Sequence, residues 1–135
     1  MNIQLTIEGN PRTKKNSMQF IRLKSGKTAL VQSKLYAAYK QTFVLQAKNA
    51  YKSDPIGEAI NIKCLYYRGD RRRVDLVNLQ NATLDLLIEA GILKDDNSNI
   101  VVSMDGSRVY FDKENPRVEI YITSFNNNND NKEDE

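Results

Sequence analysis

The chain contains no histidine and no tryptophan, and Cys64 is its single cysteine. Without histidine, the protein cannot use a histidine-activated nucleophile, a histidine general base or a histidine-bound zinc ion. A single cysteine also excludes a disulfide within the chain. Cys64 lies in a segment of alternating apolar residues, 60–66, where we expect a buried and inert thiol. Any catalysis must therefore rest on carboxylates, lysines or a hard metal ion.

Long hydrophobic runs are also missing. No run approaches the roughly 18 apolar residues that a membrane-spanning helix needs, so no membrane partner is expected. Residues 1–6 lack the basic and apolar regions of a signal peptide. The 135 residues, 40% of them hydrophobic and 27% charged, suit one globular domain. We assign this domain to residues 1–124, and residues 125–135 are predicted to form a disordered acidic tail.

Charge is unevenly distributed along the chain, although the net charge is only +3. Residues 1–73 hold 15 Lys and Arg against 4 Asp and Glu, whereas residues 74–124 hold 4 against 9. A metal-dependent nuclease needs cations for phosphates and carboxylates for the metal, and this division suits both needs. A solvated surface with uneven charges is the alternative interpretation.

Periodicity predicts an α+β fold, a mixed β-sheet packed by two helices. Strands are expected at 3–8, 59–67 and 118–123, a hairpin at 19–31, and a second hairpin at 100–111 that turns at Asp105-Gly106. The first helix is expected to begin after an N-cap at Ser33 and to reach about Ala50. Its inner face should contain Leu35, Ala38, Phe43 or Val44, Leu45 and Ala47.

The second helix, Asp75–Ala90, has the clearest pattern in the chain. Its apolar residues recur at helical spacing, and Gly91 supplies the C-terminal stop. The residues expected on its inner face are Leu76, Leu79, Thr83, Leu86, Leu87 and Ala90.

Acids and amides gather in the segments that flank this helix, residues 71–79 and 91–99. Mg²⁺ prefers oxygen ligands, usually one or two carboxylates with waters and substrate phosphate. Asp75, Asp95 and Asp96 could supply such a site if the chain after Gly91 folds back along the helix. The helix itself would separate its two ends by about 24 Å, so any closure must come from the sheet.

Each of these features also has a purely structural interpretation. Asp75 could be the N-cap of its helix. The segment 95–98 could be a surface Asx turn. The run Arg71-Arg72-Arg73 could be a solvated strand end.

These elements follow one another in a set order: arginines, Asp-x-x-Asn, an amphipathic helix, Gly and then Asp-Asp. This order resembles that of the RusA family of Holliday-junction resolvases. The resemblance is strongest across residues 71–102, and the basic loop after Gly9 is similar to the opening of that family. It implies a homodimer that cuts opposing strands of four-way DNA with Mg²⁺ or Mn²⁺. It also implies action in the cytoplasm of a bacterial or phage-infected cell, with a prophage as the source.

By motif match, Asp75, Asp95 and Asp96 are the implied metal-binding aspartates, and Asn78 is the motif asparagine. Arg71, Arg72 and Arg73 would grip backbone phosphates, together with Lys14, Lys15 and Asn16 of the N-terminal loop. Lys94, beside the acidic pair, is a further catalytic candidate because it could stabilise charge on the phosphate.

Two positions depart from the family motif. Val77 stands where a second aspartate is usual, and Asn81 stands where a lysine is usual. Lys94, Lys14 or Lys15 could replace the ammonium, and Asp105 could replace the carboxylate. We expect Val77 to occupy a packed position. These departures keep two rival functions open, a junction-binding protein without strong catalysis and an RNA-binding or accessory module.

Overall fold

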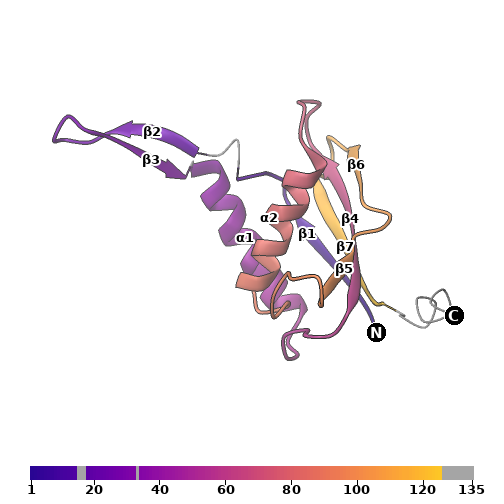
Figure 1. Ribbon diagram of the computed structural model, residues 1–135. Coiled ribbons are helices and arrows are strands. Elements are labelled where there is room, and N and C mark those ends of the chain that lie inside the picture. The colour runs from indigo at the N-terminus through magenta and orange to yellow at the C-terminus, as the bar shows by residue number, and fades with distance from the viewer. Residues whose placement is uncertain (15–17, 33, 126–135) are drawn as a thin grey trace, which may run out of the picture.

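The computed structural model describes residues 1–14, 18–32 and 34–125, and it forms one domain of two helices and seven strands in that part of the chain (Figure 1). Lys15, Asn16, the expected N-cap Ser33 and the expected tail after Phe125 lie outside the described residues. In chain order the elements are β1 Asn2–Glu8, β2 Met18–Arg22, β3 Thr28–Gln32, α1 Lys34–Ala50, β4 Ile60–Arg68, α2 Leu76–Glu89, β5 Val101–Ser103, β6 Arg108–Phe111 and β7 Arg117–Ser124.

Five strands form one mixed sheet. Its order is β1-β7-β4, with β5 and β6 both on the outer side of β4. The pairs β1–β7 and β7–β4 are antiparallel, whereas β5 and β6 run parallel to β4. Both helices lie against one face of this sheet (Figure 1). The predicted α+β architecture is therefore confirmed.

The core lies between that face and the helices. Every second residue of the central strands is buried, as expected for a sheet with one covered face. The buried strand residues are Leu5, Ile7, Ile60, Ile62, Cys64, Tyr66, Val118, Ile120 and Ile122. Burial raises the pKa of the Cys64 thiol to about 12, which keeps it protonated and confirms the buried thiol predicted from the sequence.

The inner face of α1 agrees with the prediction at Phe43 and Ala47 and differs from it at Leu35, Ala38 and Leu45. Tyr36, Tyr39, Phe43 and Ala47 are buried, whereas Leu35 and Leu45 are 63% and 61% exposed. Ala38 is exposed as well. The tyrosines carry more apolar area than a leucine and form an aromatic row with Phe43, so they take the core face.

Helix α2 follows the prediction closely. Leu79, Thr83, Leu86, Leu87 and Ala90 are buried, and Leu76 packs partly against the core. The Thr83 hydroxyl lies 2.8 Å from the Tyr66 hydroxyl, which satisfies two polar groups inside the core. Gly91 has φ +78°, the left-handed conformation that ends a helix without strain only at glycine.

The expected hairpin at 100–111 is wrong. β5 and β6 do not pair with each other but follow one another along the same side of β4, at Ile60–Asn61 and at Leu65–Arg68. Asp105-Gly106 is a turn between them. Its backbone is tied to the Asn61 side chain, whose Oδ1 accepts from the Asp105 N–H at 2.8 Å. The sequence shows the turn, but only strand pairing decides whether a turn reverses the chain.

No helix in the described part of the chain is long and apolar enough to cross a membrane.

Candidate active site

Asp75 lies at the N-terminal end of α2, where it is the N-cap. Its backbone is extended, and its Oδ1 accepts a hydrogen bond of 2.9 Å from the Val77 N–H. The structural interpretation of Asp75 is therefore confirmed. Capping engages one carboxylate oxygen, and the side chain is exposed at a helix end that attracts anions. Asp75 can thus cap the helix and still face a ligand.

The three arginines lie in the connection between β4 and α2, so they do not continue the strand. All three are exposed. The Arg71 guanidinium stacks over the Phe111 ring at 4.0 Å, while the Arg72 N–H donates to Asp70. An ordered backbone with solvent-facing guanidinium groups suits phosphate contact.

Asp70 holds this connection in place, a role that the sequence did not reveal. Its Oδ1 accepts from the Arg72 N–H at 2.9 Å and from Arg68 at 3.2 Å, and its Oδ2 accepts from the Asn10 amide at 3.3 Å. Asn10 in turn accepts from the Gly69 N–H at 2.8 Å. The Arg72 hydrogen bond, and then the Arg68 charge, hold the pKa of Asp70 below its usual value. The N-terminal loop and the arginine run are thereby joined.

The open side of α2 forms a polar stripe that we define as Asn78, Asn81 and Asp85, at helical spacing below Asp75. Lys14, from the N-terminal loop, reaches this stripe and forms an ion pair of 2.9 Å with Asp85. Lys14 was one candidate to replace the motif lysine that this chain lacks at Asn81. This ion pair places it beside α2. Asp85 was not singled out from the sequence, although its distance of seven residues from Asn78 puts both on one helical face.

Val77 is 59% exposed, so the expectation of a packed position is wrong. Asn81 is exposed as well. Both departures from the family motif thus face solvent beside the stripe, because residues 77 and 81 lie one turn apart on the side of α2 away from the core. No packing constraint explains either departure.

Lys94, Asp95 and Asp96 lie at the opposite end of α2. The chain after Gly91 docks on Ile56, whose N–H donates to Ile92 and whose carbonyl accepts from Lys94. Ile56 precedes the first residue of β4, whereas Asp75 follows its last. The fold-back along the helix that a site of all three aspartates would require therefore does not occur. The 14 residues of α2 separate the two ends by about 21 Å.

The acidic pair lies in a self-contained surface loop, in which the Asx turn is made by Asn97, whose Oδ1 accepts from the Asn99 N–H at 3.0 Å, and not by Asp95. Asp95 accepts from the Asp96 N–H at 2.8 Å and from the Asn97 amide at 3.0 Å, and these bonds hold the pKa of Asp95 below its usual value. In the described ranges, no three Asp, Glu or Cys side chains form a group that could hold a metal ion. One chain therefore does not bring Asp75, Asp95 and Asp96 together. Asp105, tied to Asn61 near the start of β4, does not join Asp75 either.

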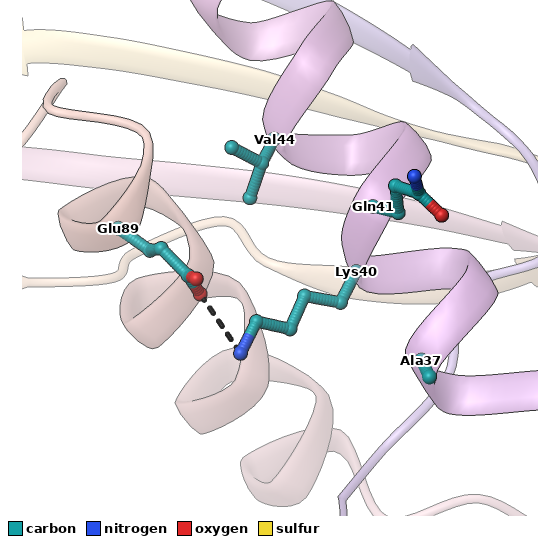
Figure 2. A pocket seen from close by; sticks show the side chains of 5 residues that line it. All are labelled: Ala37, Lys40, Gln41, Val44 and Glu89. Carbon is teal, nitrogen blue, oxygen red and sulfur yellow. Dashed lines mark ion pairs between the residues drawn. The ribbon is translucent and has the colours of Figure 1, made fainter. Parts of the chain in front are cut away.

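A hollow between the helices is a separate feature. It is lined by Ala37, Lys40, Gln41 and Val44 of α1 and by Glu89 of α2, and Figure 2 shows Lys40 reaching from α1 toward Glu89. Lys40 and Glu89 form an ion pair of 3.2 Å across it, so its two charges neutralise each other. Glu89 belongs to the C-terminal end of α2, and the hollow is remote from Asp75.

Comparison with known proteins gives one family. No curated protein matches the chain. The family model described as endodeoxyribonuclease RusA matches residues 6–123. That range contains both helices, strands β2 to β6, the last three residues of β1 and all of β7 except Ser124. The predicted resemblance is thus confirmed over almost the whole described chain, and the protein belongs to the RusA endodeoxyribonuclease family.

Proposed function

We propose that this protein resolves four-way DNA junctions by paired phosphodiester hydrolysis that depends on Mg²⁺ or Mn²⁺. The proposal depends on the set of residues found at the N-terminal end of α2. There an exposed carboxylate, a helix N-terminus and three exposed arginines occur together in a chain of an endodeoxyribonuclease family. The substrate is chromosomal or phage DNA, so we place the protein in the cytoplasm.

The residues of this end have distinct roles in the proposal. Arg71, Arg72 and Arg73 bind phosphates on either side of the cut, because a guanidinium offers two parallel donors to a phosphate. The partial positive charge of the α2 N-terminus adds to this attraction. Asn78, half-exposed one turn into the helix, orients the phosphate by hydrogen bonding. Lys14, whose ammonium is paired with Asp85 about 15 Å along α2 from Asp75, would bind a phosphate of the DNA away from the cut.

The metal is proposed from the donor chemistry of Asp75. Mg²⁺ commonly takes only one or two protein carboxylates and fills its other positions with waters and phosphate oxygens. Asp75 fits that requirement, since its Oδ2 is not the oxygen that caps α2. When bound, the ion would lower the pKa of a water and neutralise charge on the phosphate. A closed cage of Asp75, Asp95 and Asp96 within one chain does not fit the fold.

Paired cuts require two active sites, and a symmetric homodimer provides them. We therefore propose that the active form is a dimer. Lys94, Asp95 and Asp96 would take part in catalysis only where a second copy presents them to Asp75, because the two ends of α2 are too far apart within one chain.

The variant Asp75→Asn tests the proposal. Asn caps a helix about as well as Asp, so the variant keeps the cap and removes only the negative charge. We expect junction cleavage in Mg²⁺ to fall by roughly 10²-fold or more, while junction binding in EDTA stays near wild type. Asp75→Ser, which also caps, is the matched control and should lose cleavage to the same extent. Normal cleavage by Asp75→Asn would show that Asp75 is a cap only.

A junction-binding protein without strong catalysis is the second candidate. Two observations favour it. Val77 and Asn81 replace the usual second aspartate and lysine of the motif, and Asp95 and Asp96 are separated from Asp75 by the length of α2. Wild-type protein that binds four-way DNA tightly, prefers it to a linear duplex and makes no metal-dependent nick would establish this function instead.

A further inference from the structure

The strands β2 and β3 form a hairpin that stands apart from the rest of the molecule. Figure 1 shows it extending away from the body beyond the N-terminal end of α1. The two strands pair only with each other among the described strands. We call this hairpin, residues 18–32, the arm.

The arm is exposed where its side chains are described. Phe20 is 75% exposed, and Ile21 and Leu23 are 39% and 43% exposed. A two-stranded hairpin has no core of its own and is marginally stable in water. A large exposed aromatic residue on such an element is typical of a surface that binds a partner.

The charge of the arm and of the segment around it identifies the chemistry of that partner. The arm contains three cations, Arg22, Lys24 and Lys27, and no acidic residue. Moreover, no Asp or Glu occurs anywhere in residues 9–53. That segment contains ten Lys and Arg: Arg12, Lys14, Lys15, Arg22, Lys24, Lys27, Lys34, Lys40, Lys48 and Lys52. A polyanion is the matching occupant.

Among polyanions, the geometry of the arm favours a nucleic acid. Two backbone hydrogen bonds close its tip, from Leu23 to Lys27 at 2.8 Å and from Gly26 to Leu23 at 2.9 Å, so Lys24 and Lys27 stay at its end. Phe20 and Arg22 lie on one face of β2, because alternate residues of a strand share a face. The major groove of B-DNA admits a two-stranded β-ribbon, and there an aromatic side chain can pack on a thymine methyl group while a neighbouring cation binds a phosphate.

The base of the arm lies near the candidate active site. The segment that precedes the arm carries Lys14, which is held 2.9 Å from Asp85 on α2. The same segment begins at Asn10, which is bonded to Asp70 beside the arginine run. DNA bound along the arm would therefore continue toward the N-terminal end of α2.

We propose that the arm is a DNA-binding β-ribbon that holds a duplex arm of the substrate, with Arg22, Lys24 and Lys27 on phosphates and Phe20 against a base or sugar. This inference rests on the proposed function, because it assumes that the protein acts on DNA. It adds an element that contacts the substrate outside the cleavage site. The arm has no part in the chemistry at Asp75.

Two arm variants of the full chain test the proposal, with fluorescence anisotropy on a labelled four-way junction in EDTA at several salt concentrations. Arg22→Gln/Lys24→Gln/Lys27→Gln should weaken binding and reduce the slope of log affinity against log salt by roughly 0.9 per lost phosphate contact. Phe20→Ser should lower affinity severalfold with an unchanged slope, because losing an apolar contact in the groove releases no counterions. Both variants should keep the wild-type thermal midpoint, since the arm lies outside the core.

The control is Lys48→Gln/Lys52→Gln, which removes two charges from exposed positions at the opposite end of α1 from the arm, and its effect on the slope is compared per removed charge. It should leave the slope near wild type. An equal loss of slope in the control would show a diffuse charge effect and overturn the proposal. So would arm variants that bind like wild type, or that change from dimer to monomer by light scattering, which would make the arm a contact between copies. If the arm variants fail this way while the wild type still cuts junctions, the proposed function stands. If the wild type neither binds nor cuts DNA, both proposals fail.

Discussion

The two ends of α2 carry the same kind of residue in different settings. At the N-terminal end, Asp75 caps the helix among exposed arginines and within reach of the N-terminal loop. At the C-terminal end, both carboxylate oxygens of Asp95 accept hydrogen bonds from its own loop, and the preceding residues dock on Ile56. Aspartates of one motif are therefore not equivalent. The N-terminal end is arranged to meet an anion, whereas the C-terminal end is arranged to close a turn.

The largest expected effect tests whether the two ends act together across a dimer. Asp75→Asn and Asp96→Asn should each reduce junction nicking by roughly 10²-fold or more. An equimolar mixture of the two inactive variants, allowed to exchange subunits, should recover about a quarter of wild-type nicking. Half of the dimers would then be mixed, and each would keep one intact pair of aspartates. A gel assay on a labelled junction measures this recovery.

Two other outcomes would change the comparison. A mixture that stays inactive would mean that each chain must supply both aspartates, by a rearrangement of the loop at 95–99. An active Asp96→Asn variant would leave the C-terminal end with a structural role alone.

The next effect concerns the arginines of the N-terminal end. Replacing Arg71, Arg72 and Arg73 with Ala should reduce the salt slope of junction binding by roughly 0.7–0.9 per lost phosphate contact. At the C-terminal end, Lys94→Ala should reduce it by one contact at most. Equal slopes for the triple variant and the wild type would mean that the arginines are merely solvated.

A smaller effect is expected from Val77→Asp. Because Val77 is exposed in the first turn of α2, an aspartate there fits sterically and interacts well with the helix dipole. It also adds a carboxylate two residues from Asp75. We expect a several-fold lower Mg²⁺ concentration for half-maximal cleavage and an unchanged thermal midpoint. Val102→Asp, another exposed valine remote from Asp75, is the control and should leave the metal requirement unchanged.

The two helix ends should also differ in stability by small and measurable amounts. Asp75→Ala should destabilise the fold by about 0.5–2 kcal/mol because it removes the N-cap. Gly91→Ala should cost about 1 kcal/mol because its φ of +78° disfavours a side chain. Urea unfolding measures both. Asp75→Asn should stay near wild type, and a large loss there would mean that its catalytic test reports on folding.

The smallest effect is a pH dependence at both ends. The pKa values of Asp70 and Asp95 are lowered, chiefly by backbone hydrogen bonds from Arg72 and Asp96. A lowered folded-state pKa contributes stability above the unfolded-state pKa, and that stability is lost as the pH falls through the folded value. Carboxyl carbon NMR titrations should place both midpoints below the usual aspartate value. In the variant Asn10→Ala, the pKa of Asp70 should rise toward the usual aspartate value, whereas the pKa of Asp95 should not change.

Much of the fold could be predicted because its signals are local. The alternation in β4 and β7 and the helical spacing in α2 both follow from burying one face, so periodicity is sufficient to recognise them. The inner face of α1 was harder, because tyrosine and leucine compete for a core position and only the packed neighbours decide between them. The pairing of β5 and β6 with β4 was missed because strand pairing is not local.

Of the candidate site, the sequence by itself indicated the family, and it offered the cap at Asp75, the solvated arginines and a surface turn at 95–98 as structural interpretations. Each depends on residue types within a few positions of one another, where local backbone geometry follows from chemistry. Only the tertiary structure decided that Asp70 and Asn10 join two distant segments, that Lys14 reaches Asp85, and that Asp95 and Asp96 lie at the opposite end of α2 from Asp75. Distances between such segments depend on strand order and loop docking, and no spacing along the chain contains that information.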